Sequence, residues 1–300
     1  MADEWIAERL AELGIEIVGQ IDQPHVRPWA TVLRVPTSRG DAYFKANAPA
    51  LSQEAALVGF LADRRPDCTP RLLAVDPSRG WILMADAGVR LRELIEAERS
   101  LDRWRDVLPL YAGVQLDLAD EVDELLALGV GDLRLAVLPA RAEAMLDALV
   151  HLGADELRRT RALIPRVREQ CAELASFGLP ETIQHDDFHD GQVFVQDGRY
   201  LLLDWGDACI SHPFFTMAVT LDGVIAWGVD DVDGSEDTTP YRDAYLAPFA
   251  RVADEADLVA ACEIARRLGW LGRAVNGYEG GSEPDQATLT RLRMFLDGRA

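Results

Sequence analysis

The spacing of apolar and polar residues differs between the first third of the chain and the rest. Before residue 85, short apolar or alternating runs predict β-strands, and turn residues such as those of Pro36–Asp41 separate them. The predicted strands are Ile15–Ile21, Trp29–Val35, Ala42–Ala46, Arg71–Val75 and Trp81–Met84. Two stretches of this part have helical spacing instead, Trp5–Leu13 and Leu51–Arg64.

After residue 88 the apolar positions recur about every 3.6 residues, which is typical of amphipathic helices. The predicted helices are Leu91–Glu98, Trp104–Leu128, Pro139–Val150, Asp155–Ala175, Pro213–Trp227, Tyr241–Ala250, Ala256–Ala274 and Gln286–Leu296. Two short β runs, Val193–Val195 and Tyr200–Leu203, interrupt the helices and predict a hairpin. The sequence therefore predicts a two-lobed α+β fold. Residues 1–85 form an antiparallel sheet carrying one helix, and residues 86–300 form a mainly helical lobe.

The net charge of the chain limits the classes of partner that it is expected to bind. The 300 residues include 30 basic and 51 acidic ones, which gives a formal net charge of −21. Such a charge repels phosphate backbones and anionic lipids, so we expect neither nucleic acid nor membrane as the main partner. No apolar run is long enough for a membrane helix, and the first residues lack the features of a signal peptide. A cytoplasmic protein with reduced cysteines is expected.

The basic residues are almost all arginine, and Lys45 is the only lysine of the chain. Arginine therefore serves wherever a general positive charge is enough. A lysine supplies a compact ammonium on a flexible stem, which a planar guanidinium cannot replace at every site. Lys45 is accordingly a candidate functional residue.

The densest group of polar residues is His185–Gln192, directly before the predicted hairpin, and Asp204 follows the hairpin. Because a hairpin brings its two ends together, Asp187, Gln192 and Asp204 are expected to converge. Two carboxylates and an amide oxygen are hard ligands that suit Mg²⁺ beside the phosphates of a substrate. An aspartate near an acceptor hydroxyl also supplies a base for phosphoryl transfer.

These residues resemble motifs of the aminoglycoside phosphotransferase-like kinases, relatives of the protein kinases. His185–Gln192 is similar to their H-G-D-x-H-x-x-N catalytic loop, and Asp204-Trp205-Gly206 to their metal-binding motif. The resemblance implies a protein-kinase-like fold and a kinase that uses ATP, or another nucleoside triphosphate, with Mg²⁺. It implies that Asp187 is the catalytic base, that Gln192 and Asp204 bind the metal, and that His185 is structural.

The N-terminal part carries further elements of the resemblance. Lys45 ends a predicted strand and Glu54 lies on the next helix, like the ion pair that holds the phosphate-binding lysine of kinases. Ile82–Gly88 resembles the hinge of the family. There the Ala85 carbonyl and the Ala87 amide would bind the adenine edge, with Met84 as the gatekeeper.

Three positions depart from the family pattern. Gln192 stands where the family has asparagine, and Asp186 where it has glycine. The segment Asp22–Trp29, which would cover the phosphates, has no glycine and two prolines, and a proline offers no N–H to a phosphate oxygen. These departures keep a nucleotide-binding pseudokinase open as an alternative. A metal-dependent hydrolase is a third hypothesis, based on the histidines and aspartates of residues 185–190.

The acceptor of the phosphoryl group is expected to be a small molecule with a hydroxyl. One feature bears on its charge. Acidic residues lie at i, i+3, i+4 and i+7 of the predicted helix Trp104–Leu128, so that they would share one face. They are Asp117, Asp120, Glu121 and Glu124. Such a face would favour an amine-bearing acceptor, although a solvated acidic surface also explains it.

Overall fold

A computed structural model describes residues 2–149, 154–279 and 285–298. The chain divides into two compact units. The first comprises Met1–Leu91 and Gly191–Gly206, and the second comprises Arg92–Asp190 and Asp207–Ala300. The predicted lobe boundary at residues 85–86 lies close to this division, but the segment Gly191–Gly206, which contains the hairpin, groups with the first unit. From the sequence, we expect residues 1–85 to bind the nucleotide phosphates and residues 86–300 to carry the catalytic loop, the metal site and the acceptor site, and these assignments stay predictions.

The first unit is built on two antiparallel sheets. The larger has the order β1-β2-β3-β5-β4, and the smaller has the order β10-β9-β6. Their strands are β1 (Asp22–Val26), β2 (Ala30–Thr37), β3 (Gly40–Asn47), β4 (Leu72–Asp76), β5 (Trp81–Ala85), β6 (Val89–Arg90), β9 (Val193–Gln196) and β10 (Arg199–Leu202). The predicted hairpin is confirmed as β9 and β10, with Leu202 opposite Val193.

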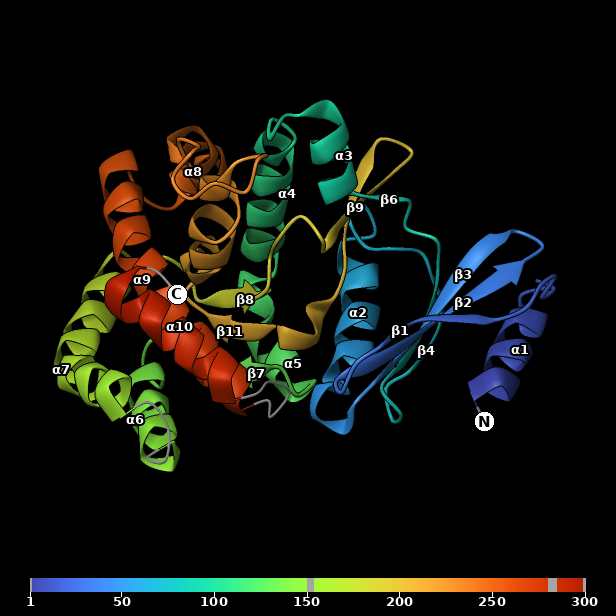
Figure 1. The fold of residues 1–300 in the computed structure, drawn as a ribbon, viewed down its shortest axis with the longest axis horizontal. Helices are drawn as coiled ribbons and strands as arrows, with labels where there is room; N and C mark the ends of the chain where they lie inside the picture. The colour runs from blue at the N-terminus through green and yellow to red at the C-terminus, as the bar shows by residue number, and fades with distance from the viewer. Residues whose placement is uncertain (1, 150–153, 280–284, 299–300) are drawn as a thin grey trace. The chain divides into compact units, whose positions relative to one another are not determined.

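Two helices flank the larger sheet, α1 (Ala2–Glu12) on one side and α2 (Gln53–Arg64) on the other (Figure 1). Successive side chains of a strand point to opposite faces, so β3 faces both helices. Phe44 packs in a buried cluster with Ile6 and Leu10 of α1. Lys45, the next residue, bonds to Glu54 of α2. The alternation of the strand thus directs Lys45 to the α2 face.

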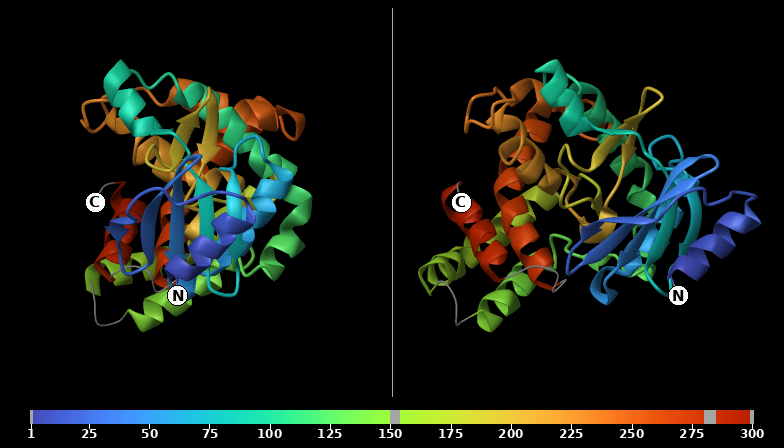
Figure 2. Two further views of the ribbon diagram at one scale, coloured as in Figure 1. Left: turned by 90° about the vertical axis from the view of Figure 1, so that its right-hand side faces the viewer. Right: turned by 45° about the vertical axis from the view of Figure 1, so that its right-hand side comes forward.

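The second unit is mainly helical (Figures 1 and 2). Its small sheet has the order β7-β11-β8, and α9 packs against both α10 and α6. The strands are β7 (Gly131–Asp132), β8 (Thr182–Gln184) and β11 (Cys209–Ser211). The helices are α3 (Leu91–Glu98), α4 (Trp104–Asp117), α5 (Val122–Ala127), α6 (Leu138–Ala148), α7 (Ala154–Ser176), α8 (Thr239–Leu246), α9 (Glu255–Glu279) and α10 (Asp285–Asp297). None of the helices within the described residues is both long and apolar enough to cross a membrane.

Three predicted elements are wrong. Ile15–Ile21 forms only an isolated bridge at Ile17, because Pro36 of the neighbouring strand accepts a bond from Val18 but has no N–H to return one. The predicted helix Pro213–Trp227 is broken into short 3₁₀ and π turns. The end of the predicted helix Pro139–Val150, at Val150, lies outside the described residues.

The third wrong element is the helix Trp104–Leu128, which ends at Asp117 and resumes only at Val122. The chain leaves helical geometry at Leu118, where ψ is 4°. The four acidic residues from Asp117 to Glu124 therefore do not share one face of a continuous helix. This removes the structural argument from the sequence for a cation-binding acidic face.

Candidate active site

Lys45 lies among the carboxylates of the first unit. Its ammonium donates to both oxygens of Glu54, with Nζ–Oε1 and Nζ–Oε2 distances of 2.8 Å and 2.6 Å. Glu54 is in the first turn of α2 and is only 1% exposed. A buried carboxylate needs a compensating charge, and Lys45 supplies it. The ion pair expected from the sequence is thus formed.

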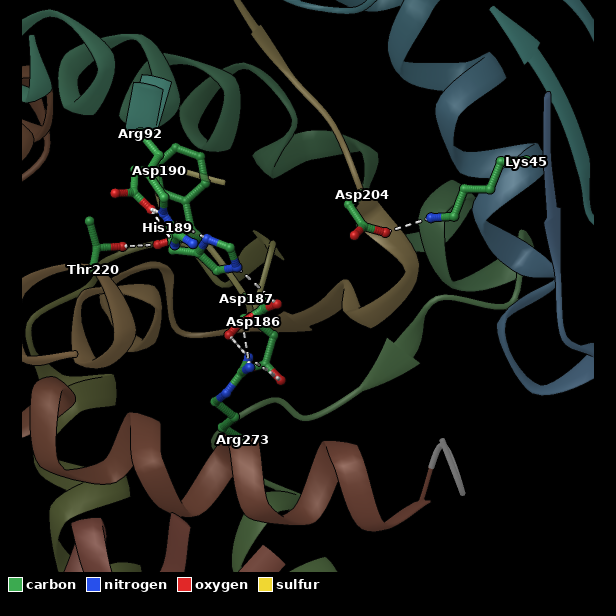
Figure 3. A network of polar contacts seen from close by, with 10 residues as sticks. Lys45, Arg92, Asp186, Asp187, His189, Asp190, Asp204, Thr220 and Arg273 are labelled. Atoms are coloured by element: carbon green, nitrogen blue, oxygen red, sulfur yellow. Dashed lines mark hydrogen bonds and ion pairs between the residues drawn. The ribbon is translucent and has the colours of Figure 1, made fainter. Parts of the chain in front are cut away.

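Lys45 also contacts a second carboxylate, that of Asp204. Its ammonium donates to Oδ1 of Asp204, with an Nζ–Oδ1 distance of 2.5 Å. Figure 3 shows the two side chains pointing toward each other. Burial opposes the charge of Lys45, but Asp204 and Glu54 outweigh it and hold the pKa of Lys45 above its usual value. Lys45 is therefore a permanent cation. Asp204 itself is 47% exposed on its side chain, so this carboxylate is accessible to solvent.

The turn after Asp204 is attached to α2 by a further residue. Gln53 donates from Nε2 to the carbonyl of Gly206, at 3.0 Å. Gly206 also lies against Glu54, because a Cβ added to it would stand 3.4 Å from Oε2. Helix α2 therefore holds both the lysine and the motif Asp204-Trp205-Gly206.

Gln192 directly precedes the first strand of the hairpin, β9. Its carbonyl accepts a bond of 2.9 Å from the Leu203 amide, which continues the ladder beyond Leu202 and Val193. Gln192 and Asp204 thus flank the open end of the hairpin, as expected. Their amide and carboxylate oxygens are hard donors and suit Mg²⁺, which takes few protein ligands and shares the rest with phosphate. Within the described residues, no group of three or more His, Cys, Asp or Glu side chains is placed to hold a metal, so the metal-dependent hydrolase has no such site there.

The predicted hinge, Ile82–Gly88, comprises most of β5 and the turn after it. Met84 pairs with Tyr43 in the ladder, and the Ala85 amide donates to the carbonyl of Arg71 at 2.9 Å. The chain then turns at Gly88, whose φ is +89° and whose Cβ position lies 2.2 Å from the Val195 carbonyl oxygen. Only glycine fits there. The roles of Met84, Ala85 and Ala87 toward a base remain predictions.

In the second unit, the loop His185–Asp190 is anchored by aromatic and hydroxyl groups. Phe188 is buried and stacks on Tyr111, with ring centroids 4.2 Å apart. The Tyr111 hydroxyl accepts the amide of His185 at 2.9 Å, and Thr220 donates to the carbonyl of Phe188 at 2.7 Å. His185 is fully buried, and the structural role that the resemblance implies for it stays a prediction.

Asp186 explains one departure from the family pattern. Its φ is +64°, a left-handed value that glycine adopts freely and aspartate tolerates better than most residues. The side chain is buried and accepts bonds of 2.8 Å from Gln184 and from Asn276. Burial raises the pKa of Asp186, while Arg273 and Asn276 act against this rise.

Asp187 lies between two cationic side chains (Figure 3). Arg273 donates to its Oδ1, and Nε2 of His189 lies 3.5 Å from its Oδ2. Burial acts to raise the pKa of Asp187, but Arg273 and then His189 outweigh it, so the pKa lies well below the usual value. Asp187 is ionised at every physiological pH.

His189 continues this row of alternating charges. Its Nδ1 lies 3.7 Å from Asp190, which in turn accepts bonds of 2.9 Å and 2.6 Å from Arg92 of α3. Burial opposes protonation, but Asp187 and Asp190 raise the pKa of His189 to about 9. The loop is therefore held by charges from both of its sides.

The comparisons with known proteins agree with this geometry. The phosphotransferase enzyme family matches the chain over residues 25–257. The chain belongs to this family. It is a phosphotransferase with an alcohol group as acceptor, and the resemblance found in the sequence is confirmed. The search of curated proteins gave no significant match.

Solved structures that resemble this phosphotransferase are distant in sequence and share its protein-kinase-like fold. One is an ethanolamine kinase from Plasmodium vivax (12% identity, TM-score 0.62, covering 98% of this chain and 86% of that one). Another is choline kinase LicA from Streptococcus pneumoniae (14%, 0.61, 99% and 98%). A third is an aminoglycoside phosphotransferase in complex with GDP and kanamycin (14%, 0.62, 98% and 97%).

Four site residues of the phosphotransferase escaped the sequence reasoning: Gln53, Arg92, Arg273 and Asn276. Each contacts the motif residues from far away in the chain, and no local pattern sets it apart from its neighbours. Arg273 and Asn276 also lie beyond the part that the family matches. Arg273 and Asn276 have one signal between them, which is their spacing of three residues in the otherwise apolar stretch of α9 from Leu268 to Tyr278.

Proposed function

We propose that this phosphotransferase transfers the γ-phosphoryl group of ATP, or of another nucleoside triphosphate, to a hydroxyl of a small acceptor with the help of Mg²⁺. The observation that carries the proposal is the contact of Lys45 with both Glu54 and Asp204. One ammonium held by a buried carboxylate and by a half-exposed one is suited to phosphate on one side and to a metal ligand on the other.

Each candidate site residue of the first unit has a role in this proposal. Lys45, held by Glu54, binds the α- and β-phosphates. Met84, Ala85 and Ala87 border the nucleotide base. Asp204 and Gln192 would hold Mg²⁺, which would neutralise negative charge on the phosphates.

Asp187 accepts a hydrogen bond from the acceptor hydroxyl. This bond directs a lone pair of the hydroxyl oxygen at the γ-phosphorus. The new O–P bond forms as the bond to the β,γ-bridging oxygen breaks, and the electron pair of that bond leaves with the nucleoside diphosphate. The hydroxyl proton becomes acidic as the new bond forms, and it passes through Asp187 to solvent. Because such transition states are loose, orientation and charge neutralisation supply most of the catalysis.

For the acceptor, we propose an amine-bearing alcohol. The support is that several of the solved structures that resemble the chain are named for aminoglycosides, choline or ethanolamine, which carry a cationic nitrogen and a hydroxyl, although others are named for macrolides. The net charge of −21 favours the approach of such cations. We further propose a cytoplasmic location, where nucleoside triphosphates are available.

Nucleotide binding tests the first half of the proposal. We expect ATP or GTP with Mg²⁺ to raise the melting temperature of the wild-type protein, since a ligand that binds only the folded state stabilises it. Asp204→Asn should reduce the part of this shift that depends on Mg²⁺. A wild-type protein that no nucleoside triphosphate stabilises at millimolar concentration would contradict the proposal.

A pseudokinase is the second candidate, and Gln192 is the observation that favours it. The extra methylene of glutamine moves the amide oxygen by about a bond length, and Mg²⁺ tolerates little error in geometry. If the loop has adjusted to Gln192, Gln192→Asn should lower the rate of nucleotide hydrolysis. A higher rate in this variant would mean that the native residue impairs the metal site, as in a pseudokinase.

A further inference from the structure

Helix α9 presents two polar residues to the catalytic loop. Arg273 and Asn276 are three positions apart and therefore lie on the same face of the helix. Asn276 donates to Oδ2 of Asp186 at 2.8 Å and to the carbonyl of Asp207 at 2.7 Å. Arg273 reaches the same loop, as Figure 3 shows. One face of α9 thus contacts both aspartates that follow His185.

The guanidinium of Arg273 divides its donors between backbone and side chain. Nη1 donates to the carbonyl of Asp186, and Nη2 donates to Oδ1 of Asp187. A planar fork can make both bonds at once, whereas an ammonium cannot match this geometry. The side chain is only 11% exposed, so water competes little for these bonds. From α10, Arg291 donates to the carbonyl of Arg273 at 3.3 Å.

We propose that Arg273 is a positioning residue for phosphoryl transfer, which fixes the carboxylate of Asp187 so that it presents an oxygen to the acceptor hydroxyl. The proposal rests on the function proposed above for Asp187. It assigns a role in the reaction to α9, from a part of the chain beyond the family match at residues 25–257.

Two of the contacts of Asp187 define the orientation of its carboxylate. Arg273 holds Oδ1, and His189 stands 3.5 Å from Oδ2. Held at both oxygens, the group cannot rotate about its last bond without losing an ion pair. An acceptor hydroxyl therefore meets an acceptor oxygen of fixed direction, which is the condition for an aligned attack.

The same contacts make Asp187 a weak base and a good hydrogen-bond acceptor. The charged groups that act on it are Arg273 from α9, His189 and His185 from its own loop, and the neighbouring Asp186. A loose transition state needs little proton removal before the new bond forms, so orientation serves the reaction better than basicity. Removing Arg273 would leave a buried carboxylate with less compensation and a higher affinity for protons.

The test compares Arg273→Lys and Arg273→Gln with Arg266→Lys. Arg266 is a matched control, because it also lies on α9 and forms a partly buried ion pair, with Asp222, outside the catalytic loop. The probe is the hydrolysis of ATP or GTP with Mg²⁺, in which water replaces the acceptor. We expect both Arg273 variants to lose about 100-fold in kcat, with the KM for nucleotide unchanged. Arg266→Lys should keep the wild-type kcat.

The pH profile separates positioning from a structural role. In Arg273→Gln, the acidic limb of kcat should move toward neutral pH, because Asp187 loses a cation and stays buried. Should Arg273→Gln fail to fold, the loss of kcat in Arg273→Lys decides the question alone. An Arg273→Lys kcat equal to that of Arg266→Lys, or a loss confined to the KM for nucleotide, would overturn the inference.

Asp187→Asn distinguishes this inference from the proposed function. If Asp187→Asn abolishes hydrolysis while Arg273→Lys behaves as the control, Asp187 acts as proposed and only the role of Arg273 fails. If Asp187→Asn hydrolyses nucleotide at the wild-type rate, the proposed function of Asp187 fails, and the inference fails with it.

Discussion

At the scale of single residues, the charge of Lys45 is the feature on which the first unit depends. Its ammonium contacts three carboxylate oxygens, two of Glu54 and one of Asp204. Glu54 is almost without solvent, and Lys45 is the main compensation for its buried charge. Lys45 therefore stabilises the first unit, in addition to the phosphate-binding role proposed for it.

The effects of Lys45 on stability and on nucleotide binding can be separated by two variants. Lys45→Met leaves Glu54 as an uncompensated buried charge, and we expect it to lower the free energy of unfolding by about 3 kcal/mol. Lys45→Met combined with Glu54→Gln removes that charge and should recover part of the loss, while nucleotide binding stays absent. Urea unfolding measures the first effect and nucleotide-dependent melting the second. If Lys45→Met alone is as stable as the wild type, Lys45 does not compensate the charge of Glu54.

His212 has a different effect, on the pH dependence of stability. The ring is fully buried beside Phe214 and Phe215, and its Nδ1 accepts the Phe214 amide. In the described part of the chain, its Nε2 has no hydrogen-bond partner. Burial lowers the pKa of His212 to about 3. The folded protein thus holds this histidine neutral, whereas the unfolded chain protonates it near pH 6.5.

Acidification between these two values therefore favours the unfolded state. The free energy of unfolding should fall by about 1.4 kcal/mol for each pH unit between pH 6.5 and 3 on account of His212, and its contribution is complete above pH 6.5. His212→Asn keeps an acceptor for the Phe214 amide but does not titrate. Urea unfolding at pH 6.5 and pH 5 should show a smaller difference in this variant. An equal difference in both proteins would remove His212 from the account.

At the scale of elements, α2 and α9 position the two sets of site residues in their own units. Helix α9 can do so because it packs closely on the turn Pro213–Thr216. Gly269 marks the closest approach, since a Cβ there would stand 2.4 Å from the Phe215 carbonyl oxygen. This contact requires glycine in the middle of a helix, where its flexibility is otherwise unfavourable.

Alanine at two helical glycines tests this packing. Gly269→Ala should lower the free energy of unfolding by about 2 kcal/mol, because the backbone of Phe215 cannot yield without moving α9. Gly59→Ala on α2 is the control. Its Cβ would stand 3.8 Å from Val75, so helix propensity should raise stability by about 1 kcal/mol. Thermal melting of the two variants should change in opposite directions, and a stabilised Gly269→Ala would contradict the packing account.

The elements also show what the sequence could predict. Helices such as α3 and the hairpin β9–β10 follow from local spacing, and they were predicted within a residue or two. Local spacing predicted a strand at Ile15–Ile21, and this strand is not formed because a proline on the neighbouring strand limits its pairing. The strands β7, β8 and β11 have two or three residues each, which is too short for an alternation to be seen.

For the site, the sequence could propose candidates where the chemistry is local. Asp187, Gln192 and Asp204 lie in motifs around one hairpin, and Lys45 is set apart as the sole lysine. The left-handed backbone of Asp186 could have been suspected from its place in a glycine position. For Arg273, the spacing that it shares with Asn276 marks a polar pair on α9, but its contact with Asp187 depends on how α9 packs, which the sequence does not reveal.

For the whole molecule, the central claim is transfer of a γ-phosphoryl group to the hydroxyl of a small acceptor. The most direct measurement is mass spectrometry of amino alcohols and amino sugars incubated with the protein, Mg²⁺ and ATP or GTP. We expect the wild-type protein to phosphorylate at least one of them. Asp187→Asn should give no phosphorylated product, although nucleotide still raises its melting temperature. The claim is contradicted if no hydroxyl compound is phosphorylated, or if Asp187→Asn forms product as fast as the wild type.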